Sequence, residues 1–212
     1  MGLTGTCGAT LDEARRYQIA LSGGALRTDL VLDGTRQHLE EASVAAAFTY
    51  RLSTVSFQLS LGALLGGSLD GALGNYDLQP GVVSSASLGL TMLDGTGPRP
   101  YLGFTATLGV ATAQTHSTSD PTDRPRFTAL DLRAAVVFGK QLFGFWLPYL
   151  GAATFGGPVW FAAGGQPHTG SDRYHYRLSA GSSFRLPAHL EVFVEVGFLG
   201  EQNLLGGLGW SF

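Results

Sequence analysis

Apolar and polar residues alternate along most of the chain with a period of two. In residues 190–198 the even positions are all bulky and apolar, whereas the odd positions hold Glu191, Phe193, Glu195 and Gly197. Because successive side chains of a β-strand point to opposite faces of a sheet, this alternation is typical of strands with one apolar face. It predicts ten strands, at residues 17–30, 42–52, 55–66, 80–93, 100–114, 126–138, 143–155, 173–186, 190–199 and 204–212. Eight strands are the alternative if the short last hairpin does not form.

The two faces of the predicted strands differ in the size of their side chains. One face carries bulky apolar residues, and the other carries mainly Gly, Ala, Ser and Thr. Charged residues of the strands with the clearest alternation lie on the second face, at Arg51, Asp131, Arg133, Arg177, Arg185, Glu191 and Glu195. A bulky apolar face suits contact with lipid, and small residues suit a narrow interior. We therefore predict an all-β fold, a transmembrane antiparallel up-and-down β-barrel, with a soluble barrel such as a lipocalin as the alternative.

The predicted connections alternate between short turns and long loops. Ser53-Thr54 and Gly139-Lys140-Gln141 are compact turns, whereas longer polar stretches lie at residues 33–41, 66–79, 116–125 and 156–172. Transmembrane β-barrels combine short turns at one end with longer loops at the other. An even number of strands places both termini at the short-turn end. We predict a barrel domain over residues 16–212, preceded by a tail or short plug over residues 1–15.

The composition fits a chain whose surface meets lipid. Charged residues make up 14% of the 212 residues, against about 25% in soluble domains. The formal net charge of −3 and the apolar content argue against a nucleic-acid-binding protein and a disordered chain. A single cysteine, Cys7, excludes a disulfide framework and a zinc cluster. The uncharged stretch 142–165 contains Pro148, Pro158 and several of the 31 glycines, which suits strands and loops better than a membrane helix.

The end of the chain carries a family resemblance. The last residues are Leu208-Gly209-Trp210-Ser211-Phe212, an alternating segment with a terminal phenylalanine. This segment resembles the assembly signal of bacterial outer-membrane β-barrel proteins, with Leu208, Trp210 and Phe212 as its apolar positions. The resemblance extends in pattern from about Tyr17 to Phe212. It implies a Gram-negative outer membrane, a cleaved export signal, both termini in the periplasm, contact with outer-membrane lipid and lipopolysaccharide, and folding by the barrel assembly machinery.

Some outer-membrane barrels are hydrolases, and their motifs are not evident in this chain. The omptin proteases use acid pairs with an Asp-His pair, but no Asp-x-Asp occurs and neither His175 nor His189 has an adjacent acid. Lipid A deacylases carry a His-x-Ser motif on a strand, and His116-Ser117 lacks that spacing. We therefore assign no catalytic residue. An outer-membrane hydrolase acting on lipid A or peptides stays an alternative, because a catalytic set converges in space and not in sequence.

Histidines also fall in the predicted external loops, at His38, His116 and His168, with acidic residues nearby. Carboxylates can hold calcium and imidazoles can hold transition metals. None of these loops has an ordered ligand spacing, so we expect no metal and no cofactor. A hydrated external surface that contacts lipopolysaccharide through divalent ions is the preferred interpretation.

The charges on the inner face carry the functional hypotheses. Arg185 with Glu191, and Asp131 with Arg133 and Arg177, are expected to form polar networks, because buried charges need partners. Such networks either brace and plug the barrel or line a narrow lumen with a slight preference for anions. The expected function is a narrow channel or a structural component of an envelope assembly with envelope protein partners. A binding module that recognises a partner through its external loops is a further alternative, and nucleic acid is not expected as a partner.

Overall fold

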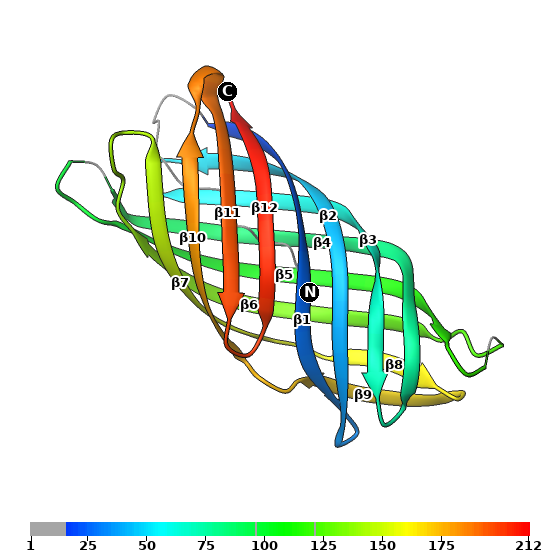
Figure 1. Cartoon of the computed structure of the whole chain (residues 1–212). Coiled ribbons are helices and arrows are strands. Elements are labelled where there is room, and N and C mark those ends of the chain that lie inside the picture. Colours follow the sequence, from blue (N-terminus) through cyan, green and yellow to red (C-terminus); the bar gives the residue numbers. More distant parts are fainter. Residues whose placement is uncertain (1–15, 96, 121) are drawn as a thin grey trace.

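The computed structural model describes residues 16–95, 97–120 and 122–212. Most of the described chain is β-strand, and the pairings between its strands are antiparallel. The strands, shown in Figure 1, are β1 (Tyr17–Leu32), β2 (Thr35–Leu52), β3 (Val55–Gly71), β4 (Gly74–Asp94), β5 (Tyr101–Ser117), β6 (Arg126–Gly139), β7 (Trp146–Gly156), β8 (Val159–Ala163), β9 (Gln166–Asp172), β10 (Tyr176–Arg185), β11 (Leu190–Phe198) and β12 (Gln202–Ser211), with the 3-10 helix η1 (Pro187–His189) between β10 and β11. No helix in the described ranges is long and apolar enough to cross a bilayer.

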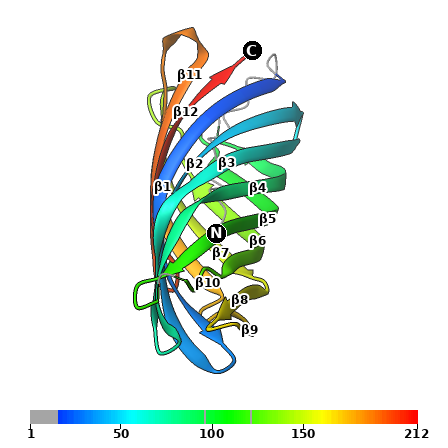
Figure 2. The ribbon, with the colours of Figure 1, turned by 90° about the vertical axis from the view of Figure 1, so that its right-hand side faces the viewer.

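The sheet closes on itself at the seam between β1 and β12. β1 pairs with β2 on one side and with β12 on the other, and the β1–β12 pairing runs from Gln18–Ser211 to Arg27–Gln202. Figure 2 shows the sheet curving around until these two strands lie side by side. The predicted all-β, antiparallel barrel is confirmed.

The number of strands differs from the prediction. The structure has twelve strands, so the prediction of ten, with eight as the alternative, was wrong. The difference arises where two long crossings are interrupted. β7 and β8 both pair with β6 and run in the same direction, separated by Gly157-Pro158. β9 and β10 follow one another in the same way, separated by residues 173–175. Because Pro158 has no backbone N–H to donate to a neighbouring strand, it favours the interruption between β7 and β8.

These interruptions divide the barrel into two rings of different size. The ring that contains both ends of the described chain runs through β1–β7 and β10–β12, and we call this part the terminus half. The β11–β12 hairpin turns back at residues 199–201, and beyond it β9 pairs directly with β1 at Leu30–Asp172. The second ring, the far half, therefore consists of β1–β6, β8 and β9. The barrel narrows from ten strands to eight along its axis.

The long external loops predicted from the sequence are mostly strands. β1 and β2 are joined by Asp33-Gly34, β3 and β4 by residues 72–73, and β8 and β9 by Gly164-Gly165. The prediction of long loops at residues 33–41, 66–79 and 156–172 was therefore wrong, and residues 118–125 alone among those stretches form a longer connection within the described chain. Asp33 and Gly34 both have positive φ, as the two-residue turns of tight hairpins require. Asp-Gly is the preferred sequence for such turns, so this signal was present in the sequence.

The two halves present opposite kinds of surface. On β1 the outward side chains are Tyr17, Ile19 and Leu21 in the terminus half but Arg27 and Asp29 in the far half. Outward side chains of the terminus half form an apolar belt, which includes Ile19, Leu21, Phe48, Leu59, Leu61, Leu88, Leu108, Leu132, Leu150, Val194 and Leu208, all more than one-third exposed. A tilted strand crosses a bilayer in about 9–11 residues, which matches the apolar part of β1. The terminus half is therefore the part suited to lipid, and the far half projects beyond it.

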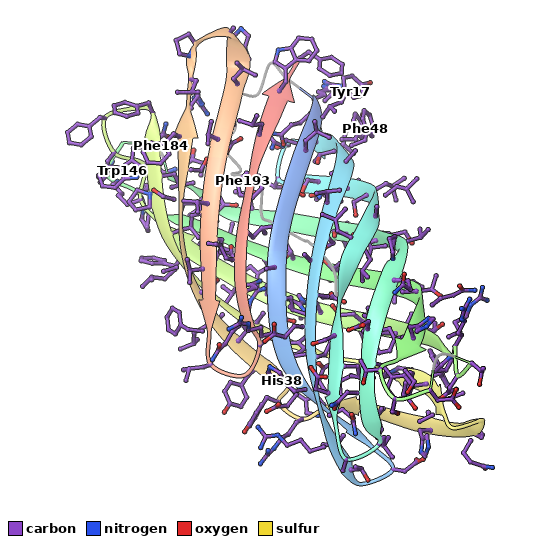
Figure 3. All side chains as sticks on the ribbon, turned by 45° about the vertical axis from the view of Figure 1, so that its right-hand side comes forward. Tyr17, His38, Phe48, Trp146, Phe184 and Phe193 are labelled. Carbon is purple, nitrogen blue, oxygen red and sulfur yellow. The ribbon has the colours of Figure 1, made fainter. Side chains whose placement is uncertain are left out.

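Aromatic side chains gather where the chain ends meet. The ring of Tyr17 stacks on those of Phe48, Tyr50 and Phe212, with centroid distances of 6.0, 5.3 and 5.9 Å. The backbone N–H of Tyr17 donates to the carbonyl oxygen of Phe212, so both described ends lie at the same end of the barrel. In Figure 3, Tyr17 and Phe48 lie at this end and His38 lies near the opposite end. The placement of this end in the periplasm stays a prediction, and the predicted tail or plug at residues 1–15 lies outside the described residues.

Candidate functional site

Apolar side chains occupy most of the interior of the far half, and we call them the far-half core. They project inward from β1–β6 and β8, and they are Leu26, Leu30, Leu32, Leu39, Leu64, Leu69, Tyr76, Leu78, Val83, Ala111, Ala113, Phe127, Ala129, Val159, Phe161 and Ala163. Buried polar side chains lie in this half too, at Thr28, Gln37, Glu41, Thr115 and Asp172. Leu30, Leu39 and Phe127 are 0% exposed. The interior of an eight-stranded barrel is just wide enough for side chains to fill it. The far half is thus a packed core with a polar outer surface.

The outer rim of this core is tied together by hydrogen bonds. The ring of Tyr76 packs edge-on against Phe161 at 4.8 Å, and its hydroxyl donates to Asp123 at 3.0 Å. The same carboxylate oxygen accepts the backbone N–H of Gly164 at 3.1 Å. Across the rim, His168 Nδ1 lies 2.9 Å from Asp33 Oδ2. These contacts tie the β5–β6 connection to β4 and to the β8–β9 turn, and they tie β9 to the β1–β2 turn.

A network of buried charges lies inside the barrel next to the far-half core. The guanidinium of Arg133 donates two hydrogen bonds to Glu201, at 2.8 and 2.6 Å, and lies 3.2 Å from Asp131. The guanidinium of Arg177 donates to Glu201 at 3.0 Å and to Glu195 at 3.1 Å. Side chains of all five residues are buried. We call this group the central network. The arginines pair with the carboxylates, as buried charges require, although both oxygens of Asp131 and the Nε atoms of Arg133 and Arg177 make no hydrogen bond to described residues.

A second polar cluster lies nearer the chain ends. Glu191 accepts hydrogen bonds from Ser183 and, at 3.2 Å, from the side-chain amide of Gln18. The amide oxygen of Gln18 in turn accepts a hydrogen bond from Arg51 at 2.6 Å. This chain links β10, β11, β1 and β2 across the seam where the barrel closes. It braces the wall in the same region as the aromatic stack.

The charged residues predicted for the inner face are placed inside the barrel, although some of their partners differ. Buried or half-buried side chains occur at all seven predicted positions, Arg51, Asp131, Arg133, Arg177, Arg185, Glu191 and Glu195. Asp131 contacts Arg133 as expected, and Arg185 is the register partner of Glu191. The expected pairing of Arg177 with Asp131 is replaced by contacts with Glu195 and Glu201. A role for these side chains in lining an open lumen stays a prediction.

Sequence reasoning missed two members of these clusters, Glu201 and Gln18. Glu201 was placed in a turn, yet it is 1% exposed and contacts two arginines. Extending the alternation of the last strand back from Leu208 would have placed Glu201 on the inner face. Gln18 lies on the inner face of β1, between the outward Tyr17 and Ile19. An uncharged amide gives no comparable signal in the sequence.

The histidines do not assemble a metal site in the part of the chain described. His38 Nδ1 lies 3.1 Å from Asp29 on the outer face, whereas His168 contacts Asp33 at the rim. His175 lies 3.1 Å from the carbonyl oxygen of Phe155. No group of three or more His, Cys, Asp or Glu residues within the described ranges has a metal-binding arrangement.

Asp120, in the connection after β5, stabilises its own turn. Its carboxylate accepts hydrogen bonds from the backbone N–H and the hydroxyl of Thr122, at 2.9 and 2.7 Å. These bonds hold the pKa of Asp120 below its ordinary value. The partners that the structure gives Asp120 are therefore those of a turn-stabilising residue.

Comparison with known proteins supports the class of fold. No protein-family model and no curated protein matches the chain. Among solved structures, the outer-membrane protease OmpT from Escherichia coli is similar with a TM-score of 0.58 and 8% identity, covering 93% of this chain and 97% of that one. The translocator domain of the autotransporter NalP from Neisseria meningitidis is similar with a TM-score of 0.51 and 10% identity, covering 93% and 88%.

A third structure gives the same result. The transport unit of the autotransporter AIDA-I from Escherichia coli has a TM-score of 0.51 and 13% identity, covering 95% of this chain and 92% of that one. At these identities the likeness concerns the fold, and proteolysis and transport are properties of the proteins named. The resemblance stated from the sequence is thus confirmed for the fold: the chain has the fold of bacterial outer-membrane β-barrel proteins.

Proposed function

We propose that the chain is a membrane-embedded structural component of the bacterial envelope whose barrel does not conduct along its axis. The far-half core carries this proposal. An ion that moved along the axis would have to pass Leu30, Leu39 and Phe127, which are 0% exposed. Apolar constrictions exclude water and ions by dewetting. The backbone pairing around this ring holds the strands at fixed spacing, so a wider path would require breaking the sheet.

The outer surface of the far half supports a structural role. Arg36, His38 and Asp77 face outward from its closed ring, beyond the apolar belt. A rigid, filled barrel extension with a charged surface suits contact with other envelope components. We propose outer-membrane lipid and lipopolysaccharide as neighbours, envelope proteins as partners of this surface, and the barrel assembly machinery as the partner during biogenesis. The net charge of −3 gives no support to a nucleic-acid partner.

Planar-bilayer recording tests the proposal. The purified protein is reconstituted into vesicles, and flotation together with heat-modifiable migration on a gel shows that the inserted protein is folded. Vesicles that pass both checks are then fused with a planar bilayer. We expect no conductance steps. Reproducible steps from the folded wild-type protein would overturn the proposal in favour of an axial channel.

A narrow channel is the second candidate, and one observation favours it. Ser60, Ser85 and Ser87 face inward in the terminus half and keep partial exposure, so this half has room for water. The anion preference expected from the sequence is not supported, because the buried carboxylates outnumber the four inner arginines once Glu41, Asp172 and Glu201 are added. A channel of this kind should prefer cations. Changing Arg133 and Arg177 to Ser should then increase cation selectivity, whereas a plugged barrel would show no current to analyse.

A further inference from the structure

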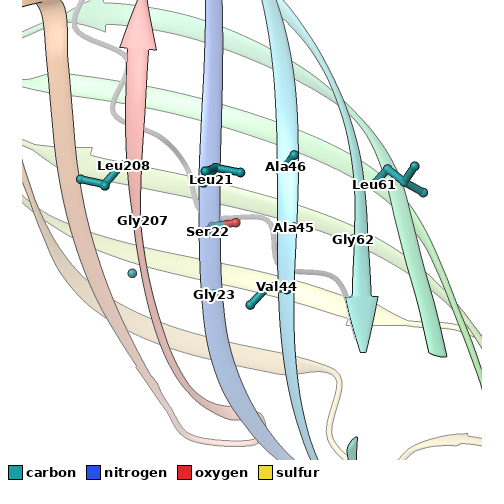
Figure 4. A pocket seen from close by; sticks show the side chains of 11 residues that line it. Leu21, Ser22, Gly23, Val44, Ala45, Ala46, Leu61, Gly62, Gly207 and Leu208 are labelled. Atoms are coloured by element: carbon teal, nitrogen blue, oxygen red, sulfur yellow. The ribbon is translucent and has the colours of Figure 1, made fainter. Parts of the chain in front are cut away.

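A groove lies on the outer wall of the barrel, at the seam where the chain closes. It has a volume of about 560 Å³ and crosses β12, β1, β2 and β3. Leu21, Leu208, Val44 and Leu61 form its walls, as Figure 4 shows. Volumes of this size are typical of small-molecule sites. The groove lies within the apolar belt, so its occupant must be apolar at this level.

The groove is hollow because small residues occupy outward positions that are bulky elsewhere in the belt. Gly23 and Gly206 are register partners across the β1–β12 seam, and both face outward. Ala46 lies opposite Leu21 on β2, where it also faces outward. The side chain of Val44 borders the space above Gly23, where its Cγ1 would lie 3.3 Å from an added Cβ, and no side chain lies within 4 Å of a Cβ added at Gly206. The leucines on either side project from the wall. The result is a depression bounded by branched apolar side chains.

The hollow continues along the same strands toward the far half. A second depression of about 410 Å³ is lined by Ala25, Ala42 and Leu65 and ends at Arg27 and Glu40. The two depressions are separated by one register pair, Gly24–Ser43. At about 3.4 Å per residue, the path from Leu21 to Arg27 is about 20 Å long. One leaflet of the hydrocarbon core is about 15 Å thick, so the combined groove spans roughly one leaflet.

The groove ends where the outer wall changes from apolar to charged. Arg27 lies 3.1 Å from Glu40 through Nε, and its side chain is 62% exposed. A second guanidinium lies beside it: that of Arg36 contacts the carboxylate of Asp29 at 2.7 Å. Asp29 and Glu40 orient these arginines. This level of the barrel corresponds to the headgroup region above the belt.

We propose that the combined groove binds one phosphate-bearing membrane lipid, with an acyl chain along the apolar depression and the phosphate at Arg27. Arginine is suited to phosphate because its planar guanidinium can donate two parallel hydrogen bonds. Arg36, which Asp29 holds in place, lies beside the same headgroup position. The site offers, in the order that a lipid molecule requires, an apolar channel followed by an exposed arginine at the membrane surface. It is independent of whether the barrel conducts.

Native mass spectrometry of the detergent-solubilised protein tests this site. Phosphatidylglycerol and diacylglycerol with the same acyl chains are added separately, and the bound fraction is measured. We expect one phosphatidylglycerol per chain, bound about tenfold more tightly than diacylglycerol, as loss of a charge-assisted hydrogen bond predicts. Arg27→Gln should lower phosphatidylglycerol binding about tenfold and leave diacylglycerol binding unchanged. Ala46→Leu should fill the groove and lower the binding of both lipids.

Two matched variants separate a specific site from the general lipid belt. Ala106→Leu adds the same side chain at another outward alanine of the belt, and Arg126→Gln removes an exposed arginine from the far half of β6. Both should bind phosphatidylglycerol as the wild type does, and heat-modifiable migration shows that each variant is folded. Equal effects of Ala46→Leu and Ala106→Leu, or of Arg27→Gln and Arg126→Gln, would overturn the proposal. A protein dimer that is lost in Ala46→Leu would identify a second copy of the chain as the occupant and would also overturn it.

Discussion

Arg133 on β6 donates two hydrogen bonds to Glu201, from its two terminal nitrogens to the two carboxylate oxygens, at 2.8 and 2.6 Å. Glu201 lies at the β11–β12 turn, where the ten-stranded ring ends and β9 takes over the pairing with β1. β7 and β10 lie between the two residues in the ring. The bidentate pair therefore ties the tip of the β11–β12 hairpin to a strand that runs through both halves of the barrel.

Glu201→Gln should destabilise the folded barrel. The substitution keeps the volume but removes the negative charge between two buried arginines, and breaking one partner of a buried ion pair costs about 3–5 kcal/mol. We expect the barrel to lose its compact gel migration at a lower temperature, and its urea midpoint in detergent to fall accordingly. Glu40→Gln is the matched control, because Glu40 pairs with Arg27 at an exposed position where such pairs contribute about 0–1 kcal/mol. Equal losses in both variants would contradict a special role of the central network.

Much of the terminus half could be predicted, because its strands mostly place bulky apolar residues outward and small or charged residues inward; the inward Tyr149 and Phe193 depart from this rule. Val194 and Val196 face outward while Glu191 and Glu195 are buried, as the alternation required. Period-two alternation fixes the face of every residue once a single one is placed. The same rule placed the predicted inner charges inside the barrel without any knowledge of their contacts.

The far half was missed because its polarity is inverted. On β2, Arg36 and His38 face outward and Leu39 faces inward, which is the pattern of a strand with water outside. Because such a segment has no apolar outer face, its sequence resembles that of a polar loop. The interruptions between β7 and β8 and between β9 and β10 were missed for a different reason. They depend on where the β11–β12 hairpin ends, and that is a property of pairing between segments distant in sequence.

Leu30→Ala should show that the far-half core contributes to stability. Leu30 is fully buried among apolar side chains, and truncating a buried leucine costs about 2–5 kcal/mol. The urea midpoint in detergent should therefore fall. Leu132→Ala is the control, because Leu132 faces outward in the belt with 64% exposure and its methyl groups contact detergent or lipid in any folded state. If Leu132→Ala were as harmful as Leu30→Ala, the far half would not be a packed core.

Gly170→Ala should loosen the ring of the far half. Gly170 pairs with Leu32 on β1 and with Val159 on β8, and an added Cβ would overlap the carbonyl oxygen of Val31. Because backbone must move to relieve that overlap, we expect faster amide hydrogen exchange in peptides that cover residues 30–32 and 170–172, with a loss of about 1–3 kcal/mol. Gly109→Ala is the control, since the nearest atoms to its added Cβ are at 3.8 Å, an ordinary contact. Unchanged exchange in Gly170→Ala would mean that β9 does not close the ring against β1 in solution.

Phe212→Ala should separate biogenesis from stability. The ring of Phe212 lies 5.9 Å from that of Tyr17 and 5.0 Å from that of Trp210, measured between centroids, so the substitution removes both ring contacts. If the last strand also serves as an assembly signal, folded protein in the outer membrane of cells should fall several-fold, while refolding yield in detergent stays near that of the wild type. Phe138→Ala, an outward aromatic position away from the chain end, should leave both yields unchanged. A parallel fall of cellular and detergent yields in Phe212→Ala would reduce the role of Phe212 to the aromatic stack that closes the seam.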